Sequence, residues 1–202
     1  MAELIFISIL FFLPAYIANM MPVIGQNLPF SEKIKKTAIN EKLFGKNKTW
    51  FGIVFGILIS TLICYIIYQI LLMYSASIHG EEYLKTVIFK SSYFFYLNIP
   101  SAVTISSGAL LGDLIESYFK RRIGLKPGYA LPFFDQTDFI FGAWIMYMIY
   151  ISIPYFNQLF FKPNYDLNLY FYILLTGLII TPFLHLSANV IAYKLRLKKV
   201  WW

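Results

Sequence analysis

The chain of 202 residues contains little cysteine, histidine or charge, and each shortage argues against a class of function. Its one cysteine, Cys64, lies within an apolar run, which excludes a disulfide framework and argues against a thiolate nucleophile. Its two histidines, His79 and His185, are too far apart in the sequence to form a metal pair by spacing. Only 13% of the residues are charged, about half the share typical of a soluble domain, and 59% are hydrophobic. The composition therefore predicts an integral membrane protein.

Internal repeats and low-complexity segments are also lacking, so we expect a single membrane-embedded domain over residues 1–202. Five apolar segments each reach the roughly 20 residues that a helix needs to cross the hydrocarbon core. These segments are Leu4–Ile24, Trp50–Met73, Ser91–Gly112, Phe139–Phe161 and Leu169–Tyr193. They predict an all-α protein with five transmembrane helices. The third is the least apolar, so we expect neighbouring helices to shield it.

The positive charges, which give a net charge of +7, are unevenly distributed among the predicted loops. Fourteen of the seventeen Lys and Arg residues fall in segments 25–49, 113–138 and 194–199, on one side of a five-span topology. The positive-inside rule then places the N-terminus outside and the C-terminus in the cytoplasm of a plasma-membrane protein. Basic residues in such short juxtamembrane loops do not indicate a nucleic-acid partner.

Residues 112–138 hold four of the ten acidic and four of the seventeen basic residues. These are Asp113, Glu116, Lys120, Arg121, Arg122, Lys126, Asp135 and Asp138. If the third helix continues past Gly112, positions 113, 116, 117, 120 and 121 share one face and Arg122 points away, at about 100° per residue. Carboxylates and cations clustered at a membrane edge favour a divalent metal such as Mg²⁺ together with phosphate. The alternative is a solvated helix face with an ordinary Glu116–Lys120 ion pair.

The return of the chain to the membrane supports the metal hypothesis. Gly124, Pro127 and Gly128 are expected to break the third helix. Asp135 and Asp138 lie three residues apart, so they share a face if the fourth helix begins there. Both ends of this short loop therefore bring carboxylates to the same membrane face.

Two further polar elements are predicted on that side. Lys48 and Thr49 follow Gly45 just before a helix, so they can offer an ammonium, a hydroxyl and backbone N–H groups to a phosphate. The spacing is not that of a Walker A loop, and the alternative is a basic juxtamembrane anchor. Asn19, near Pro22, either lines the same cavity beside a proline break or makes an interhelical hydrogen bond.

These elements resemble the family of archaeal-type CDP-archaeol synthases, relatives of the phosphatidate cytidylyltransferases. The resemblance covers nearly the whole chain and is carried by Leu13–Asn19 with Pro22, Gly45–Trp50, Gly112–Arg122, Lys126–Gly128 and Pro132–Phe139. Its most specific part is Ser117-x-x-Lys120-Arg121 followed by two aspartates, which is similar to the cytidylyltransferase signature. The resemblance implies transfer of CMP from CTP to a membrane lipid phosphate, with release of pyrophosphate, at the cytoplasmic face.

The resemblance also implies roles for individual residues. The implied ligands of Mg²⁺ or Mn²⁺ are Asp113, Asp135 and Asp138, with Glu116 and Ser117 as neighbouring partners. The implied triphosphate-binding residues are Lys120, Arg121 and Lys126, with Lys48 and Thr49 as further candidates. The metal ligands together with Lys120 and Arg121 form the implied catalytic set.

The lipid acceptor stays open between two classes. The family default is an isoprenoid ether lipid phosphate such as 2,3-bis-O-geranylgeranylglycerol 1-phosphate, which would give CDP-archaeol. Fatty-acyl phosphatidic acid is the alternative, because apolar grooves discriminate poorly between lipid tails. The sequence is compatible with a monomer or an oligomer.

Two other functions also use acidic residues at a membrane. A CDP-alcohol phosphotransferase would begin its motif with D-G-x-x-A-R, which is absent here. An ion or solute transporter could use Asp113 as an intramembrane acid. A transporter normally needs polar access from both sides, however, whereas the clustered charges of this chain face one side.

Overall fold

The computed structural model describes residues 2–26, 28, 37–79, 97–125, 129, 131, 134–153, 167–194 and 196. Their helices are α1 (Ala2–Gln26), α2 (Glu41–Phe44), α3 (Trp50–His79), α5 (Ile99–Arg122), α6 (Phe134–Ser152) and α8 (Leu167–Lys194). The one extended pairing within these ranges is an isolated antiparallel bridge between Ala38 and Thr49. The predicted all-α class is therefore confirmed for the part of the chain that the structure describes.

Each of the five predicted apolar segments overlaps one long helix. Within the described ranges, three stretches are long and apolar enough to cross a membrane: Ala2–Gln26, Trp50–Tyr74 and Leu167–Ile191. The last part of α5 is charged, and residues 91–96 of its predicted span lie outside the described ranges. Residues 154–161, the end of the fourth predicted span, also lie outside them. The five-span topology and its orientation therefore stay predictions.

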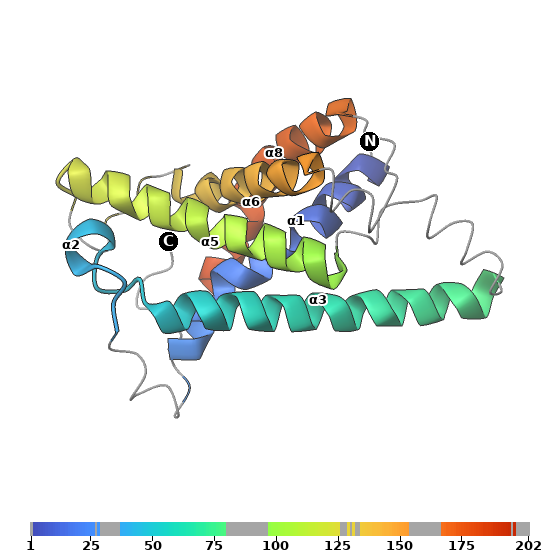
Figure 1. Ribbon diagram of the computed structural model, residues 1–202, viewed down its shortest axis with the longest axis horizontal. Coiled ribbons are helices and arrows are strands. Elements are labelled where there is room, and N and C mark those ends of the chain that lie inside the picture. The colour runs from blue at the N-terminus through green and yellow to red at the C-terminus, as the bar shows by residue number, and fades with distance from the viewer. Residues whose placement is uncertain are drawn as a thin grey trace.

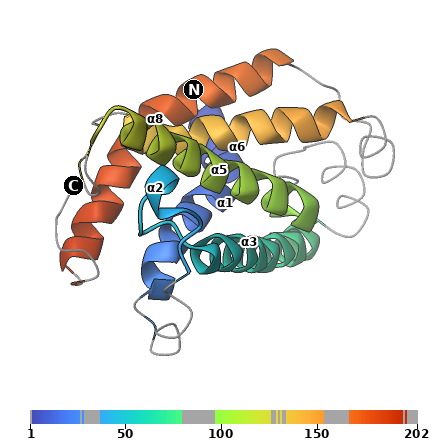
Figure 2. The same ribbon diagram turned by 60° about the vertical axis from the view of Figure 1, so that its left-hand side comes forward.

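Helix α5 occupies a central place in the bundle. It contacts α1, α2, α3 and α6, and its most extensive contact is with α6. Figure 1 shows that α3 and α5 run in opposite directions, as do α5 and α6. Helix α8 packs on α1 and α6 (Figure 2). As a result, the start of α3, the end of α5 and the start of α6 meet near α2 at one end of the molecule (Figure 1).

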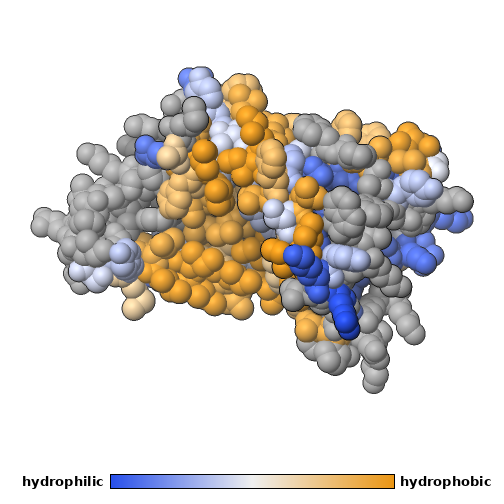
Figure 3. Space-filling view, turned by 180° about the vertical axis from the view of Figure 1, so that it is seen from behind, coloured by the Kyte–Doolittle hydropathy of each residue, from blue (hydrophilic) through white to orange (hydrophobic). Residues whose placement is uncertain are grey.

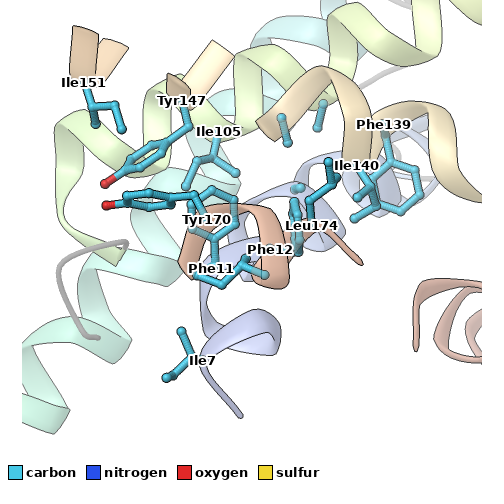
Figure 4. Packing of buried hydrophobic residues seen from close by; sticks show 14 residues of the cluster. Ile7, Phe11, Phe12, Ile105, Phe139, Ile140, Tyr147, Ile151, Tyr170 and Leu174 are labelled. Carbon is cyan, nitrogen blue, oxygen red and sulfur yellow. The ribbon is translucent and has the colours of Figure 1, made fainter. Parts of the chain in front are cut away.

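The core between α1, α5, α6 and α8 is rich in aromatic side chains (Figure 4). The ring of Phe11 meets that of Tyr147 edge-on at a centroid distance of 5.0 Å and that of Phe12 at 4.8 Å. Edge-to-face pairs add about 0.5–1.5 kcal/mol beyond the burial of their area. Such specific packing matters here because lipid removes the hydrophobic driving force between helices.

Small residues allow α5 and α6 to approach each other closely. A Cβ atom placed on Gly108 would lie only 2.5 Å from the carbonyl oxygen of Gly142, and one on Gly142 would lie 2.8 Å from Gly112 Cα. Gly108 and Gly112 have the G-x-x-x-G spacing that brings membrane helices together. This approach places Asp113, directly after Gly112, beside the turn of α6 that carries Asp138.

Polar side chains in the apolar part of α5 are buried against its neighbours. Ser106 Oγ lies 2.6 Å from Ser60 Oγ of α3 and donates to the carbonyl oxygen of Pro14 in α1 over 3.4 Å. The expected shielding of this least apolar segment by neighbouring helices is therefore observed.

The surface separates into an apolar middle and a polar end. The space-filling view shows a continuous apolar area over the middle of the molecule, with hydrophilic residues gathered toward one end (Figure 3). On α3, exposed apolar side chains recur every four residues, at Val54, Leu58, Leu62, Ile66 and Ile70. Such a stripe suits contact with lipid chains.

Candidate functional site

Helix α5 carries the charged face beyond the apolar bundle. It runs from Ile99 to Arg122, so the expected continuation past Gly112 is confirmed. The turn that ends it contains Gly124, whose φ of 79° favours glycine, and the N–H of Leu125 donates to the carbonyl of Lys120 over 3.0 Å. The expected break at Gly124 is thus observed. Pro127 and Gly128 lie outside the described residues.

Helix α6 returns two aspartates to the same end. It begins at Phe134, which places Asp135 and Asp138 about one turn apart in its first turns. Asp135 Oδ1 accepts a hydrogen bond from the N–H of Leu131 over 3.1 Å, and the N–H of Asp135 donates to the carbonyl of Leu131 over 3.1 Å. This reciprocal pair fixes the segment that enters α6.

Three carboxylates converge between α5 and α6. One oxygen each from Asp113, Glu116 and Asp138 lies within 4.8 Å of the other two. Asp138 Oδ1 is buried and has no hydrogen-bond partner within the described ranges. Hard carboxylate oxygens at this spacing, one of them without a partner, fit a divalent cation such as Mg²⁺.

The pKa values of two of these carboxyls, which lie just outside the predicted spans, reflect their crowding. Burial, and after it the neighbouring charge of Asp113, raises the pKa of Asp138 to about 8, although the N–H of Phe139 and the charge of Lys48 oppose the shift. Burial raises the pKa of Glu116 to about 7 although Lys120 opposes the shift. A bound divalent cation would stabilise the charged forms of both carboxylates.

Lys120 joins α5 to α6. Its ammonium lies 2.7 Å from Glu116 Oε1 and 2.7 Å from Asp135 Oδ1. The Glu116–Lys120 pair weighed above as the alternative therefore forms, and the same ammonium also bridges to the next helix. Asp135 thus contacts Lys120, and Glu116 stands with Asp113 and Asp138 in the acidic cluster. A metal-binding role for Asp135 stays a prediction.

The loop before α3 meets the acidic cluster through an ion pair. Lys48 Nζ donates a hydrogen bond to Asp113 Oδ2 in this ion pair. The two motifs that were expected on one side are therefore in contact. Thr49 is buried, and its hydroxyl oxygen accepts a hydrogen bond from the N–H of Gly52 over 3.0 Å. The hydroxyl therefore caps the start of α3, and a contact between Thr49 and phosphate stays a prediction.

The two arginines that follow Lys120 have different surroundings. Arg121 Nη1 donates to the carbonyl of Leu125 over 2.5 Å. The exposed Arg122 turns back along α5, where its Nε donates to the hydroxyl of Tyr118 over 2.9 Å and its guanidinium lies 5.2 Å from that ring's centroid. The two side chains thus differ in direction, as the helical period predicted.

Three further candidates were expected near the site. Ser117 is buried on the α5 face that carries the charged residues. Asn19 is half-buried in α1, which continues through Pro22 to Gln26, so the expected proline break does not occur. A proline can sit within a membrane helix when its neighbours satisfy the freed backbone group. Lys126 lies outside the described residues.

The sequence reasoning missed the glycine contact that holds α5 against α6. Its signal was present as the spacing of Gly108 and Gly112 directly before Asp113. The sequence alone did not show that Gly142 would face this pair, because helix crossings join positions distant in the chain.

Fold and site together define a helical membrane protein with a carboxylate cluster and adjacent cations, a combination that can bind a metal and an anionic substrate. The family model for CarS-like CDP-archaeol synthase matches residues 1–202. The CDP-archaeol synthase of Methanococcus aeolicus is 35% identical over 198 residues, covering 96% of this chain and 95% of that protein. The CDP-archaeol synthase of Methanocaldococcus jannaschii is 32% identical over 202 residues, covering 99% and 98%. The chain therefore belongs to the CDP-archaeol synthase family, and it is an enzyme, a cytidylyltransferase.

The fold also has a solved counterpart. A structure described as "an intramembrane enzyme for archaeal membrane lipids biosynthesis" is similar with a TM-score of 0.56 and 22% identity. The match covers 91% of this chain and 92% of that one. The two chains therefore share a fold over nearly their whole length.

Proposed function

We propose that this enzyme transfers CMP from CTP to an isoprenoid ether lipid phosphate such as 2,3-bis-O-geranylgeranylglycerol 1-phosphate. A phosphate oxygen of the lipid attacks the α-phosphorus of CTP, and the bond to the departing pyrophosphate breaks. The carrying observation is the meeting of Asp113, Glu116 and Asp138 with Lys48 and Lys120 at one end of the bundle. Transfer to phosphorus depends mainly on positioning and neutralisation of charge, which these groups can provide.

Asp113, Glu116 and Asp138 would hold Mg²⁺ or Mn²⁺, and Asp135 would join them if it left Lys120. When bound, the ion neutralises charge on the α-phosphate and the leaving pyrophosphate. Lys120 keeps Asp135 and Glu116 in place between α5 and α6. Arg121 and Lys126, with Lys48 and Thr49 across the cluster, are the groups proposed to hold the triphosphate. Ser117 and Asn19 would support them.

The whole chain, residues 1–202, would act as one membrane-embedded domain with five spans. The N-terminus would lie outside and the site at the cytoplasmic face of the plasma membrane, where CTP is available. The distribution of basic residues supports this orientation. In an Asn47→Cys variant on a Cys64→Ser background, the new thiol should react only with membrane-impermeant thiol reagents added from the cytoplasmic side. Labelling only from outside would overturn the orientation.

The reaction is tested with purified protein in lipid nanodiscs supplied with CTP, Mg²⁺ and one lipid phosphate at a time. We expect a CDP-lipid detectable by mass, with pyrophosphate in equal amount and more product from the isoprenoid ether acceptor. More product from fatty-acyl phosphatidic acid would make the chain a phosphatidate cytidylyltransferase. Failure to form a CDP-lipid from either acceptor would contradict the proposed function.

A further inference from the structure

The ammonium of Lys48 contacts one of the three acids of the proposed metal site. It pairs with Asp113 Oδ2, and the two side chains are only 27% and 24% exposed. Asp113 is also one of the three acids whose oxygens lie within 4.8 Å of one another. Lys120, the other cation close to these acids, forms its ion pairs with Glu116 and Asp135. Within the described residues, Lys48 is therefore the cation paired with Asp113.

The backbone that carries Lys48 is tied down on both sides. Its carbonyl accepts a hydrogen bond from the N–H of Ile39 over 2.9 Å, and the N–H of Trp50 donates to the carbonyl of Thr37 over 3.2 Å. Thr49 is buried between these bonds and caps α3. The ammonium can therefore leave Asp113 by rotation of its flexible side chain, without movement of the segment.

A divalent cation at the cluster would compete with this ammonium. Like charges separated by a few ångströms repel even where the effective dielectric constant is intermediate. The ion must either displace Lys48 from Asp113 or bind beside it, and both weaken the binding of metal alone. A triphosphate removes this obstacle, because its oxygens offer the ammonium another anionic partner.

We propose that Lys48 couples metal binding to nucleotide binding. It holds the Asp113 carboxylate while the site is free of nucleotide and turns to the triphosphate when metal and nucleotide arrive together. Lys48 is thus a positioning residue that disfavours metal bound without nucleotide. This inference rests on the proposed function, which supplies CTP as the nucleotide. Because coupling is reciprocal, metal must strengthen CTP binding by the factor by which CTP strengthens metal binding.

The test compares the wild type with Lys48→Met as full-length protein in nanodiscs, without lipid phosphate. Mn²⁺ affinity without nucleotide is measured by electron paramagnetic resonance, and CTP affinity by equilibrium dialysis with and without saturating Mn²⁺. In Lys48→Met we expect Mn²⁺ alone to bind at least about fivefold more tightly, the lower end of ordinary coupling between sites. The strengthening of CTP binding by Mn²⁺ should shrink in the same variant.

Two variants control for charge and folding. Lys46→Met removes the same charge two residues away, from an exposed side chain without an ion pair in the described part of the chain, and should leave both affinities unchanged. Lys48→Arg keeps a cation opposite Asp113 and should retain weak binding of Mn²⁺ alone. If Lys48→Met does not give a cooperative thermal transition, Lys48→Gln takes its place.

Unchanged Mn²⁺ affinity in folded Lys48→Met, or an equal gain in Lys46→Met, would overturn the coupling role. Formation of CDP-lipid by the wild type is measured separately. If the wild type makes product and Lys48→Met titrates as the wild type does, the inference fails while the function stands. If the wild type makes no CDP-lipid, the function fails, and the Mn²⁺ titration without nucleotide still decides whether Lys48 opposes metal binding.

Discussion

The two parts of α5 lie in opposite surroundings. Between Ile99 and Gly112 its small and polar residues are buried against α1, α3 and α6. From Asp113 to Arg122 it carries two acids and three cations at the polar end of the molecule. The first part brings the helices together through glycine contacts and hydrogen bonds. This close packing places the acids of the second part beside those of α6.

This difference explains how mutually repelling groups stay close. Asp113, Glu116 and Asp138 hold oxygens within 4.8 Å of one another, an arrangement that like charges oppose. The contact of Gly108 and Gly112 with Gly142 provides the opposing attraction one turn away. The packed part of α5 therefore holds the crowded carboxylates of the charged part together, and substitutions in the two parts should have different consequences.

The largest effect is expected in the charged part, from Asp138→Asn. The variant cannot carry the negative charge that a bound cation would stabilise on Asp138, yet it changes little volume, so kcat should fall by roughly 10²–10³-fold, as when a group that stabilises transition-state charge is lost. Mg²⁺ should raise the unfolding temperature of the wild type and not that of the variant. Glu41→Gln, at an exposed acid of α2, is the control for both measurements. Near-normal turnover of Asp138→Asn at limiting Mg²⁺ would argue against the metal site.

The next effect concerns the cations that follow the acids. Lys120→Ala and Arg121→Ala should each lower kcat/KM for CTP by about 2–4 kcal/mol in transition-state terms. Lys120→Ala should also destabilise the protein, because it leaves Glu116 and Asp135 without their shared cation. Arg122→Ala, at the exposed neighbour, should cost under about 1 kcal/mol. Equal losses at all three positions would indicate a diffuse basic patch.

A smaller effect is expected from Gly112→Ala in the packed part. The added methyl group meets the backbone of α6, so α5 and α6 must separate, at a cost of about 1–3 kcal/mol in the free energy of unfolding. Mn²⁺ affinity should fall as well, although no charge has changed. Leu111→Ala, on the exposed side of α5, is the matched control and should retain the metal affinity. A Gly112→Ala variant with unchanged Mn²⁺ affinity would show that the cluster does not depend on this packing.

The smallest effect is expected from Ser106→Ala. It removes the hydrogen bonds to Ser60 and to the Pro14 carbonyl, and such bonds between membrane helices contribute about 0.6 kcal/mol on average. Unfolding in mixed detergent should detect this loss, whereas the KM for CTP should stay the same. A large rise in that KM would mean that the apolar part also takes part in nucleotide binding.

The sequence by itself determined the helical class, the helix that continues past Gly112, the placement of the acids and cations at one end, and the family. These follow from apolar periodicity and charge, which act along a single segment of the chain. The period of α5 was sufficient to place Asp113, Glu116 and Lys120 on one face and Arg122 on another.

Tertiary structure decided which of these groups meet. Asp135 and Asp138 share the first turns of α6, yet Asp135 contacts Lys120 and Asp138 joins Asp113 and Glu116. That division depends on where α6 crosses α5, which Gly142 sets by lying against Gly108 and Gly112.

The pairing of Lys48 with Asp113 likewise joins positions 65 residues apart. Periodicity orients side chains around one helix axis, whereas the register between two helices depends on the shapes of both surfaces.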